Sequence, residues 1–415
     1  MKVNITYTIK AASDDFKLNT NYIRNFYFVE DLESMFMTAQ LEVEDKDGWV
    51  EKLPITGNET FEIDLIQEDE DKNIKVHKTL FFEIYDIKME TGTTGRTNIY
   101  TFMLVEKGFF ELLRIYYSCS FKEKTVSEII TSIFNKQLMF EKNKIKFDVE
   151  KTVEKINFTI PYWKPTTSIK YLSKIAKRSK SPQEAGFLFY STLGPDDEET
   201  SLKKFVSLAT LLEQKAKTEP EERYYLRNSS ISIYYLNNIL EVKNLSLSNK
   251  TPVKNGIGGK TFYGINFLDD KKVLKESVKL SDYIKDSIFL GETSYYTKDI
   301  EDPNSEVQFR GYSNKDLIKN EINYLFRLAF EDINKREIYC KGSLKRYCGK
   351  IIQIEEVSGN VDEMVNENLS GTWLIKKIVH YCIGESFEQK MVILKNSFGK
   401  LQDVPKQLSL SKTNK

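Results

Sequence analysis

One strand-and-turn pattern occurs twice in the sequence, and this repeat restricts the fold more than any other feature. Residues 82–87 read Phe-x-Ile-x-x-Ile, and residues 373–378 read Trp-x-Ile-x-x-Ile. In both places a shorter alternating strand precedes the motif, and a glycine-containing turn and an apolar return strand follow it. These flanking segments are 61–65, 92–95 and 99–105 in the first copy, and 351–355, Gly384 and 391–394 in the second. Spacing alone leaves two interpretations open, namely duplication of one β-barrel and chance likeness of two hairpins.

The chain is long enough for several domains and has the composition of a folded protein. Its 415 residues are 40% hydrophobic and 29% charged, which suits roughly two to four domains with real cores. Residues 1–9 alternate polar and apolar, unlike a signal peptide, and no run of about 18 apolar residues occurs. We therefore expect no leader and no stable membrane insertion. The four cysteines are irregularly spaced, which favours reduced thiols and a protein made in a cytoplasm.

The charge balance and the scarcity of histidine argue against several function classes. Lys and Arg total 61, Asp and Glu total 61, and there are two histidines. A protein that coats nucleic acid or an anionic membrane needs a net basic surface. Proton shuttles and metal ligands are often histidines. We therefore expect no enzyme, no cofactor and no metal site, and assign no catalytic residue.

Residues 1–115 are predicted to form a small antiparallel β-barrel. Strand patterns, several with the period-2 alternation of a half-buried sheet, mark six segments: 3–9, 25–29, 36–43, 61–66, 80–88 and 98–105. Threonines and glycines at 91–96 favour a hairpin connection.

Residues 116–217 change in character and are predicted to be an inserted α/β domain. Thr125 and Glu128 form a capping box in front of a helix that extends to residue 138. The further predicted elements are an extended segment over 156–165, a helix from Thr167, a strand over 187–190 and a helix over 208–217.

Sheet patterns resume after residue 217 and predict a second barrel that is split in the sequence. Its parts are 218–250 and 336–401. Between them, 251–335 is predicted to be an insertion, irregular over 260–312 and ending in a long amphipathic helix from Ser313. Residues 402–415 lack a core pattern and are predicted to be a flexible tail. The expected fold class is α+β, mainly β, with two similar antiparallel β-barrels and inserted α/β domains.

Residues 256–261 (GIGGKT) resemble part of a phosphate-binding loop. The complete motif has a glycine where this chain has Lys254, and a helix follows it directly. Residues 262–267 instead have a strand pattern. A glycine turn in a hairpin is therefore favoured over nucleotide binding.

Cys340, Cys348, His380 and Cys382 can be combined on paper into a zinc site. Structural zinc is usually held by cysteines two to four residues apart, whereas seven residues separate the first pair here. His380 and Cys382 would share one strand face. Burial of cysteine as a small apolar residue explains the set equally well, so no metal is assigned.

The remaining polar candidates also have ordinary structural explanations. A cysteine or serine nucleophile needs a histidine partner. His77 lies in a polar run typical of a solvated strand edge, and His380 lies in an apolar strand typical of a core. The basic segment Lys170–Lys180 could contact phosphate, but the solvated face of a helix explains it, because Leu172 and Ile175 occupy the other face.

The order of these elements resembles the baseplate hub proteins of contractile-tailed phages, of which the T-even hub is the best-known member. Each motif is weak alone, and the likeness rests on their succession over most of residues 1–400. The succession is the hairpin 80–105, Phe109–Leu113, the helix after Thr125, Ile160–Trp163, the second helix, residues 338–343, 349–352 and the Trp373 motif. The hub part of type VI secretion spikes is related.

The resemblance implies a homotrimer in which two tail-tube-like barrels per chain form a pseudo-sixfold ring. Such a ring joins a trimeric central spike to a hexameric tail tube or tube-initiator protein, touches other baseplate (wedge) proteins, and lets DNA and the tape measure pass. It implies a place in the virion, in the tail baseplate, after assembly in the host cytoplasm. Type VI spikes carry further domains after the hub, whereas this chain stops about 15 residues after the second barrel. The spike is therefore expected to be a separate polypeptide.

An alternative function class stays open. The chain could be a carbohydrate-binding adhesin or an unrecognised enzyme of a tail-like particle. Aromatic rings provide flat apolar contact surfaces for ligands, and the candidates are Tyr224, Tyr225, Tyr234 and Tyr235.

Overall fold

The computed structural model describes most of the chain and shows a mainly β fold, as the sequence predicts. The described residues are 2–11, 15–52, 55–69, 74–91, 97–137, 146–179, 186–214, 223–226, 239–246, 259–265, 273–279, 307–310, 315–330, 334–356, 370–384 and 386–397. Within these ranges no helix is both long enough and apolar enough to cross a membrane.

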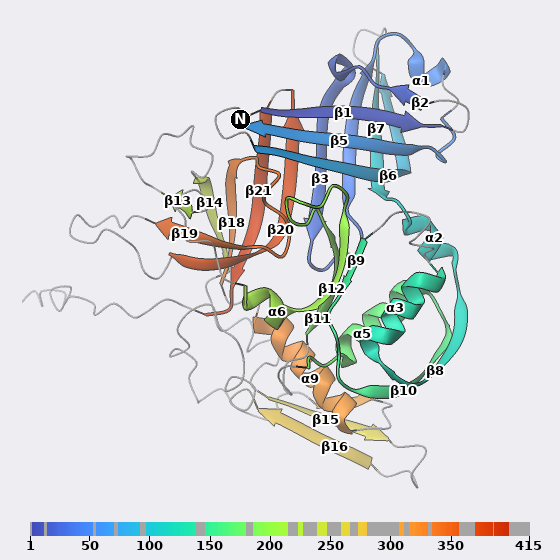
Figure 1. The fold of residues 1–415 in the computed structure, drawn as a ribbon, viewed down its shortest axis with the longest axis vertical. Coiled ribbons are helices and arrows are strands. Elements are labelled where there is room, and N and C mark those ends of the chain that lie inside the picture. The colour runs from blue at the N-terminus through green and yellow to red at the C-terminus, as the bar shows by residue number, and fades with distance from the viewer. Residues whose placement is uncertain are drawn as a thin grey trace, which may run out of the picture.

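Most strands belong to one large sheet, and three smaller sheets accompany it (Figure 1). The large sheet contains β1 (Lys2–Lys10), β2 (Asp15–Lys17), β3 (Ile23–Asp31), β4 (Thr38–Asp45), β5 (Thr60–Asp69), β6 (Ile74–Thr91), β7 (Asn98–Glu106), β13 (Arg223–Leu226), β14 (Ile239–Ser246), β18 (Asn334–Lys341), β19 (Ile351–Glu356), β20 (Gly371–Ile383) and β21 (Ser386–Lys395). The smaller sheets are β8 (Tyr117–Thr125) with β10 (Lys155–Trp163), β9 (Lys146–Val149) with β11 (Phe187–Thr192) and β12 (Leu202–Ser207), and β15 (Gly259–Ile265) with β16 (Val273–Lys279) and β17 (Val307–Arg310). The helices are η1 (Thr20–Tyr22), α1 (Trp49–Lys52), α2 (Phe109–Arg114), α3 (Val126–Gln137), α5 (Pro165–Ile175), α6 (Leu208–Leu212) and α9 (Lys315–Phe330).

The large sheet joins the two predicted barrels into one continuous structure. Its thirteen strands follow the order β14-β18-β21-β20-β3-β4-β7-β6-β5-β1-β2, with β19 and β13 branching from β20. Two closed barrels were expected, but among the described residues neither half closes on itself. The part of β20 that extends beyond its partner β19 pairs instead with β3, the edge strand of the first half, because an unpaired edge leaves backbone groups without partners. We call this β20–β3 junction the seam.

The two halves have the same strand order, which confirms the duplication. The first half runs β3-β4-β7-β6-β5 and the second half runs β14-β18-β21-β20-β19. The ladder between β6 and β7 skips Tyr85, and the ladder between β20 and β21 skips Lys376 at the same place in the motif. Each skipped residue is a β-bulge, where two residues face one on the partner strand. The bulge brings the next isoleucine back to the core face, which explains the two-residue gap in Ile-x-x-Ile.

A second bulge also recurs, so positions next to the bulges can be matched between the halves. The β14–β18 ladder has a further shift at Leu245 that the β3–β4 ladder lacks. The ladder between β3 and β4 skips Arg24, and the ladder between β14 and β18 skips Leu240. Counted from this bulge, Tyr27 on β3 corresponds to Lys243 on β14. Counted from the other bulge, residue 90 on β6 corresponds to residue 381 on β20.

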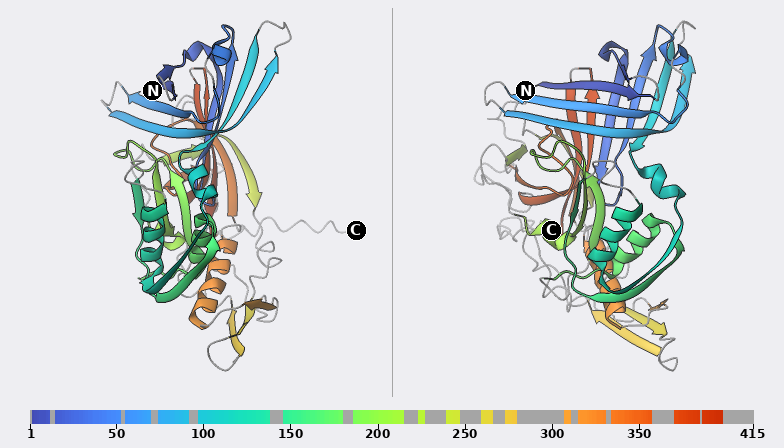
Figure 2. Two further views of the ribbon diagram at one scale, coloured as in Figure 1. Left: turned by 90° about the vertical axis from the view of Figure 1, so that its right-hand side faces the viewer. Right: turned by 45° about the vertical axis from the view of Figure 1, so that its right-hand side comes forward.

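Each half buries its core against a different partner. In the first half β1, β5 and β6 cross over β3 and β4, and aromatic side chains such as Phe28 and Phe61 fill the space between them (Figure 1). In the second half β11, β12 and α6 of the insertion cover the sheet, so Tyr190 and Leu211 pack in the same cluster as Trp373. The insertion of residues 116–217, teal to green in Figure 2, builds its core from α3 and α5, and the orange helix α9 of the second insertion packs against them.

Several elements match or differ from the sequence-based expectations in instructive ways. The capping box is confirmed, since Thr125 N donates to Glu128 Oε2 (2.9 Å) and Glu128 N donates to Thr125 Oγ1 (3.3 Å). Helix α5 begins at Pro165 rather than Thr167, because proline suits the first turn of a helix. Helix α6 ends at Leu212, and the segment expected to be irregular contains β15, β16 and β17. The expected turn residues 92–96, residues 227–238 of the predicted second barrel and the tail over 402–415 lie outside the described residues.

Candidate functional site

The seam is an antiparallel ladder between β20 and β3 that runs from Lys377 opposite Asp31 to Cys382 opposite Phe26. Residues on one face of this ladder point into the core, and His380 is fully buried there. On the other face Tyr381 stands opposite Tyr27, with ring centroids 6.0 Å apart. The seam therefore has a sealed apolar side and an uncovered side.

Glu30 is a fully buried carboxylate at the centre of the seam. Its Oε1 atom is 2.7 Å from His380 Nε2. Its Oε2 atom accepts hydrogen bonds from Thr192 Oγ1 (2.6 Å), from Leu193 N (2.9 Å) and from Cys348 N (3.1 Å). These partners come from the second half and from the insertion, and Glu30 itself belongs to the first half, so one carboxylate ties three parts of the chain together. A buried charge is tolerated only with such a set of donors.

The amide orientation of Gln389 selects which ring nitrogen of a neutral His380 carries the hydrogen. Ser343 N donates to Gln389 Oε1 (3.1 Å), so the Nε2 amino group is the end that faces the imidazole. It lies 2.9 Å from His380 Nδ1, which must therefore accept. The proton of a neutral imidazole is then on Nε2, where it is donated to Glu30. The ring is also stacked on Phe28, with centroids 4.1 Å apart.

Arg346 extends this network to β13. Its side chain is buried, its Nη1 donates to Gln389 Oε1 (3.0 Å), and its Nε donates to Tyr224 Oη (2.7 Å). Tyr224 is itself buried. It therefore cannot serve as the exposed sugar-binding surface that the adhesin alternative requires, and Tyr234 and Tyr235 lie outside the described residues.

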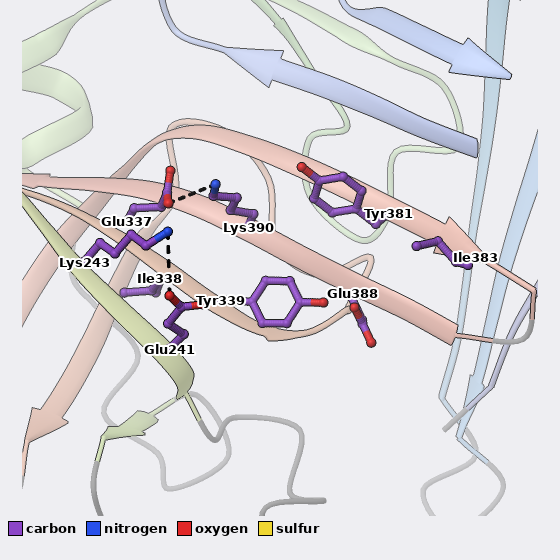
Figure 3. Close-up of a pocket in the computed structure, with 9 residues that line it drawn as sticks. All are labelled: Glu241, Lys243, Glu337, Ile338, Tyr339, Tyr381, Ile383, Glu388 and Lys390. Carbon is purple, nitrogen blue, oxygen red and sulfur yellow. Dashed lines mark ion pairs between the residues drawn. The ribbon is translucent and has the colours of Figure 1, made fainter. Parts of the chain in front are cut away.

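The uncovered face of the sheet carries paired charges. Lys390 Nζ lies 2.9 Å from Glu337 Oε1, and Lys243 Nζ lies 3.6 Å from Glu241 Oε1. These residues line a hollow of about 310 Å³ across β14, β18, β21 and β20, whose other lining residues include Tyr339 (Figure 3). The same alternation continues across the seam, where Lys377 Nζ is 3.6 Å from Asp31. This face is polar without being strongly acidic or basic.

A buried ion pair attaches the insertion to the first half. Lys203 Nζ on β12 lies 2.7 Å from Glu106 Oε2 at the end of β7, and both side chains are buried. Ser191 and Ser201 donate to the other carboxylate oxygen, at 2.8 and 2.7 Å. Burial lowers the pKa of Lys203, and the neighbouring Glu106 carboxylate opposes that shift. The contact holds β11 and β12 against the sheet.

The cysteines that could suggest zinc binding or thiol chemistry are buried in the cores of the two halves. Cys340 and Cys348 lie in the core of the second half, and Cys382 lies in the core of the first. Burial raises the pKa of all three thiols, so they are neutral and unreactive. His380 and Cys382 do share the buried face, as expected. Among the described residues no three His, Cys, Asp or Glu side chains are grouped to hold a metal.

The residues that were candidates for phosphate binding or for a catalytic histidine also have structural roles. Lys260 and Thr261 lie within strand β15 instead of at a helix start. His77 is partly exposed beside Asp64 (3.3 Å), consistent with a solvated strand edge. Arg178 departs from the expected solvated helix face, because it is buried and ion-paired with Glu150. Lys180 lies outside the described residues.

Sequence reasoning missed the central residue of the seam, although a signal exists. Phe26, Phe28 and Glu30 occupy alternate positions of one strand and so share its core face. An acidic residue at a core position needs buried donors. That pattern predicts a polar network, but only the structure identifies His380 as its partner.

Comparison with known proteins reveals a shared fold. No family model and no curated protein matches the chain. A tail protein from Neisseria meningitidis MC58 matches with a TM-score of 0.57 at 8% identity, covering 94% of this chain and 96% of that one. The 43 kDa tail protein of prophage MuSo2 from Shewanella oneidensis matches with a TM-score of 0.57 at 12% identity, covering 95% and 99%.

A chain of the Francisella PdpA–VgrG complex matches with a TM-score of 0.51 at 8% identity. That match covers 97% of this chain but 54% of the Francisella chain. At these identities the likeness concerns the fold. The fold of this chain is thus shared with these two tail proteins and with about half the length of a chain of the PdpA–VgrG complex.

Proposed function

We propose that this protein is the structural hub of a phage-type contractile tail baseplate. In this proposal three copies form a ring of six similar units, which joins a trimeric spike to a sixfold tail tube. Its partners are a separate spike protein, a tube or tube-initiator protein and the wedge proteins of the baseplate. The protein resides in the virion tail after assembly in the host cytoplasm, and it performs no catalytic step.

The observation that carries the proposal is the duplication of the sheet. Both bulges recur at corresponding positions, so one chain presents two similar units side by side in the same orientation within one sheet. A ring of three such chains has threefold symmetry overall and an approximate sixfold arrangement of its sheets. A protein of this kind can contact a threefold partner and a sixfold partner through different surfaces.

The uncovered face of the sheet supports a channel in this ring. Its acidic and basic side chains are paired, as in Lys390 with Glu337 and Lys377 with Asp31. An unpaired basic face would bind the phosphate backbone of passing DNA. A polar wall of balanced charge lets DNA move past without sticking. The near full-length likeness in fold to two phage tail proteins also favours a tail role.

The mass of the purified full-length chain tests the proposal. Mass photometry should find an assembly of three 48.4 kDa chains. Addition of the spike protein encoded in the same genome should shift this mass to that of a stable complex. The proposal is wrong if the chain is a monomer at all concentrations, fails to bind that spike, and is missing from purified tail particles of its source.

A further inference from the structure

The seam within one chain is a template for contact between chains. Strand β20 has two parts: residues up to Leu374 pair with β19, and residues from Lys377 pair with β3. Strand β6 is built in the same way, and its residues up to Glu83 pair with β5. In the described part of the chain no strand pairs with the same side of β6 beyond that point.

The strand that could pair with this open part of β6 lies at the opposite end of the sheet. Strand β14 is the counterpart of β3, and β18 is its one ladder partner among the described strands. In Figure 1 β14 lies on the left of the sheet, and the β6–β7 hairpin lies on the right. One chain thus contains one seam and two further open edges, on β6 and on β14, that match the strands of the seam. These two edges lie at opposite ends of the sheet and do not meet within one chain.

Side chains on the open edge of β6 are exposed where their counterparts on β20 are buried, and the open edge of β14 also carries exposed apolar side chains. Met89 is 58% exposed, whereas its counterpart His380 is 0% exposed. Tyr85 is 59% exposed, whereas its counterpart Lys376 is 7% exposed. On β14, Leu240 is 45% and Leu245 is 48% exposed. The edges therefore display apolar surface that a neighbouring sheet would cover.

We propose that residues 88–91 of β6 pair with residues 242–245 of β14 from a second copy of this chain, in the register of the seam. The inference rests on the trimeric hub proposed above and names the surface that closes it. In this register the counterparts of Tyr381 and Tyr27 are Glu90 and Lys243. An acidic residue of one copy then faces a basic residue of the next on the channel side. Opposite charges directly across a ladder are favourable.

Cysteine cross-linking tests the register directly. In a Cys119→Ser background, which removes the one partly exposed native thiol, Glu90→Cys and Lys243→Cys are combined. Opposed residues of an antiparallel ladder have Cα atoms about 4.5–5.5 Å apart, within disulfide range. Mild oxidation should produce covalent dimers and trimers on a non-reducing gel, and reductant should reverse them.

Two matched pairs control this experiment. Tyr27→Cys with Tyr381→Cys samples the seam of one chain, so it should form a disulfide without any increase in mass. Lys88→Cys with Glu241→Cys is displaced along the proposed ladder, so it should not cross-link. Equal cross-linking of the displaced pair would overturn the register.

Charge exchange provides a second, reversible measurement. Glu90→Lys and Lys243→Glu each place like charges across the interface and should weaken trimerisation about two- to fivefold per interface. The double exchange should restore it. If the wild-type chain is a trimer but the 90–243 pair does not cross-link while the seam pair does, the edge pairing is wrong and the trimeric hub stands. If the chain is a monomer throughout, the proposed function fails with it.

Discussion

The carboxylate of Glu30 and the imidazole of His380 lie 2.7 Å apart across the seam between the two halves of the sheet, and both side chains are fully buried. Glu30 belongs to the first half and His380 to the second. Because neither group reaches water, the hydrogen bond exists only while the halves are joined. Its loss should therefore report on the seam itself.

Replacing His380 with leucine should destabilise the protein by about 2–3 kcal/mol, because a buried carboxylate loses one charge-assisted hydrogen bond. Glu30 keeps its donors from Thr192, Leu193 and Cys348, so the loss should not be larger. Urea unfolding measures the change. Lys377→Ala, on the uncovered face of the same strand, should change stability by less than about 0.5 kcal/mol. Equal effects of the two variants would contradict the role given to the network.

Gly342→Ala should be strongly destabilising because the added methyl group meets an aromatic ring. A Cβ at this position would overlap the ring of Phe387 at Cδ1, and overpacking of this kind costs about 1–3 kcal/mol. Phe387→Ala removes the ring, so the double variant should lose less stability than the sum of the two single variants. Strict additivity in a thermal unfolding cycle would argue against the close contact.

Lys395 should make stability depend on pH in the alkaline range. Burial, aided by nearby Arg336, lowers the pKa of Lys395 from 10.5 to about 8. Between these two values the unfolded chain holds a proton that the folded chain has released, so the free energy of unfolding should rise with pH. Lys395→Met should abolish this rise and be more stable than wild type at pH 7 by up to about 3 kcal/mol. A difference independent of pH from 7 to 10 would refute the depressed pKa.

Lys203→Met should loosen the insertion from the first half of the sheet. It leaves Glu106 buried without its cation, at a cost of about 3–5 kcal/mol. Adding Glu106→Gln removes the uncompensated charge and should recover much of that loss. Limited proteolysis should cut the single variant faster than the double one, and equal rates would mean that the pair does not hold the insertion.

The repeated spacing is visible in the sequence because bulges and alternation are local features, although spacing alone left duplication and chance likeness both open. The spacing Phe82-x-Ile84-x-x-Ile87 reflects the alternation of a strand interrupted by a bulge. The same alternation and bulge explain the spacing of the motif that begins at Trp373. The capping box at Thr125 is equally local and is confirmed. The seam was not predictable in this way. Pairing of β20 with β3 joins residues about 350 positions apart, as in His380 and Glu30, and no periodicity within either strand names its partner.

By itself the sequence determined that the fold is mainly β, because hydrophobic periodicity sets the buried face of each strand, and it left duplication as one of two interpretations. Only the tertiary structure decided that the two halves share one sheet in place of two closed barrels. Only there do Glu30 and His380 meet, and only there do β6 and β14 emerge as open edges. The physical reason is that hydrogen-bonded ladders and buried charges are satisfied by groups distant in the chain, whose proximity exists once the whole sheet has formed.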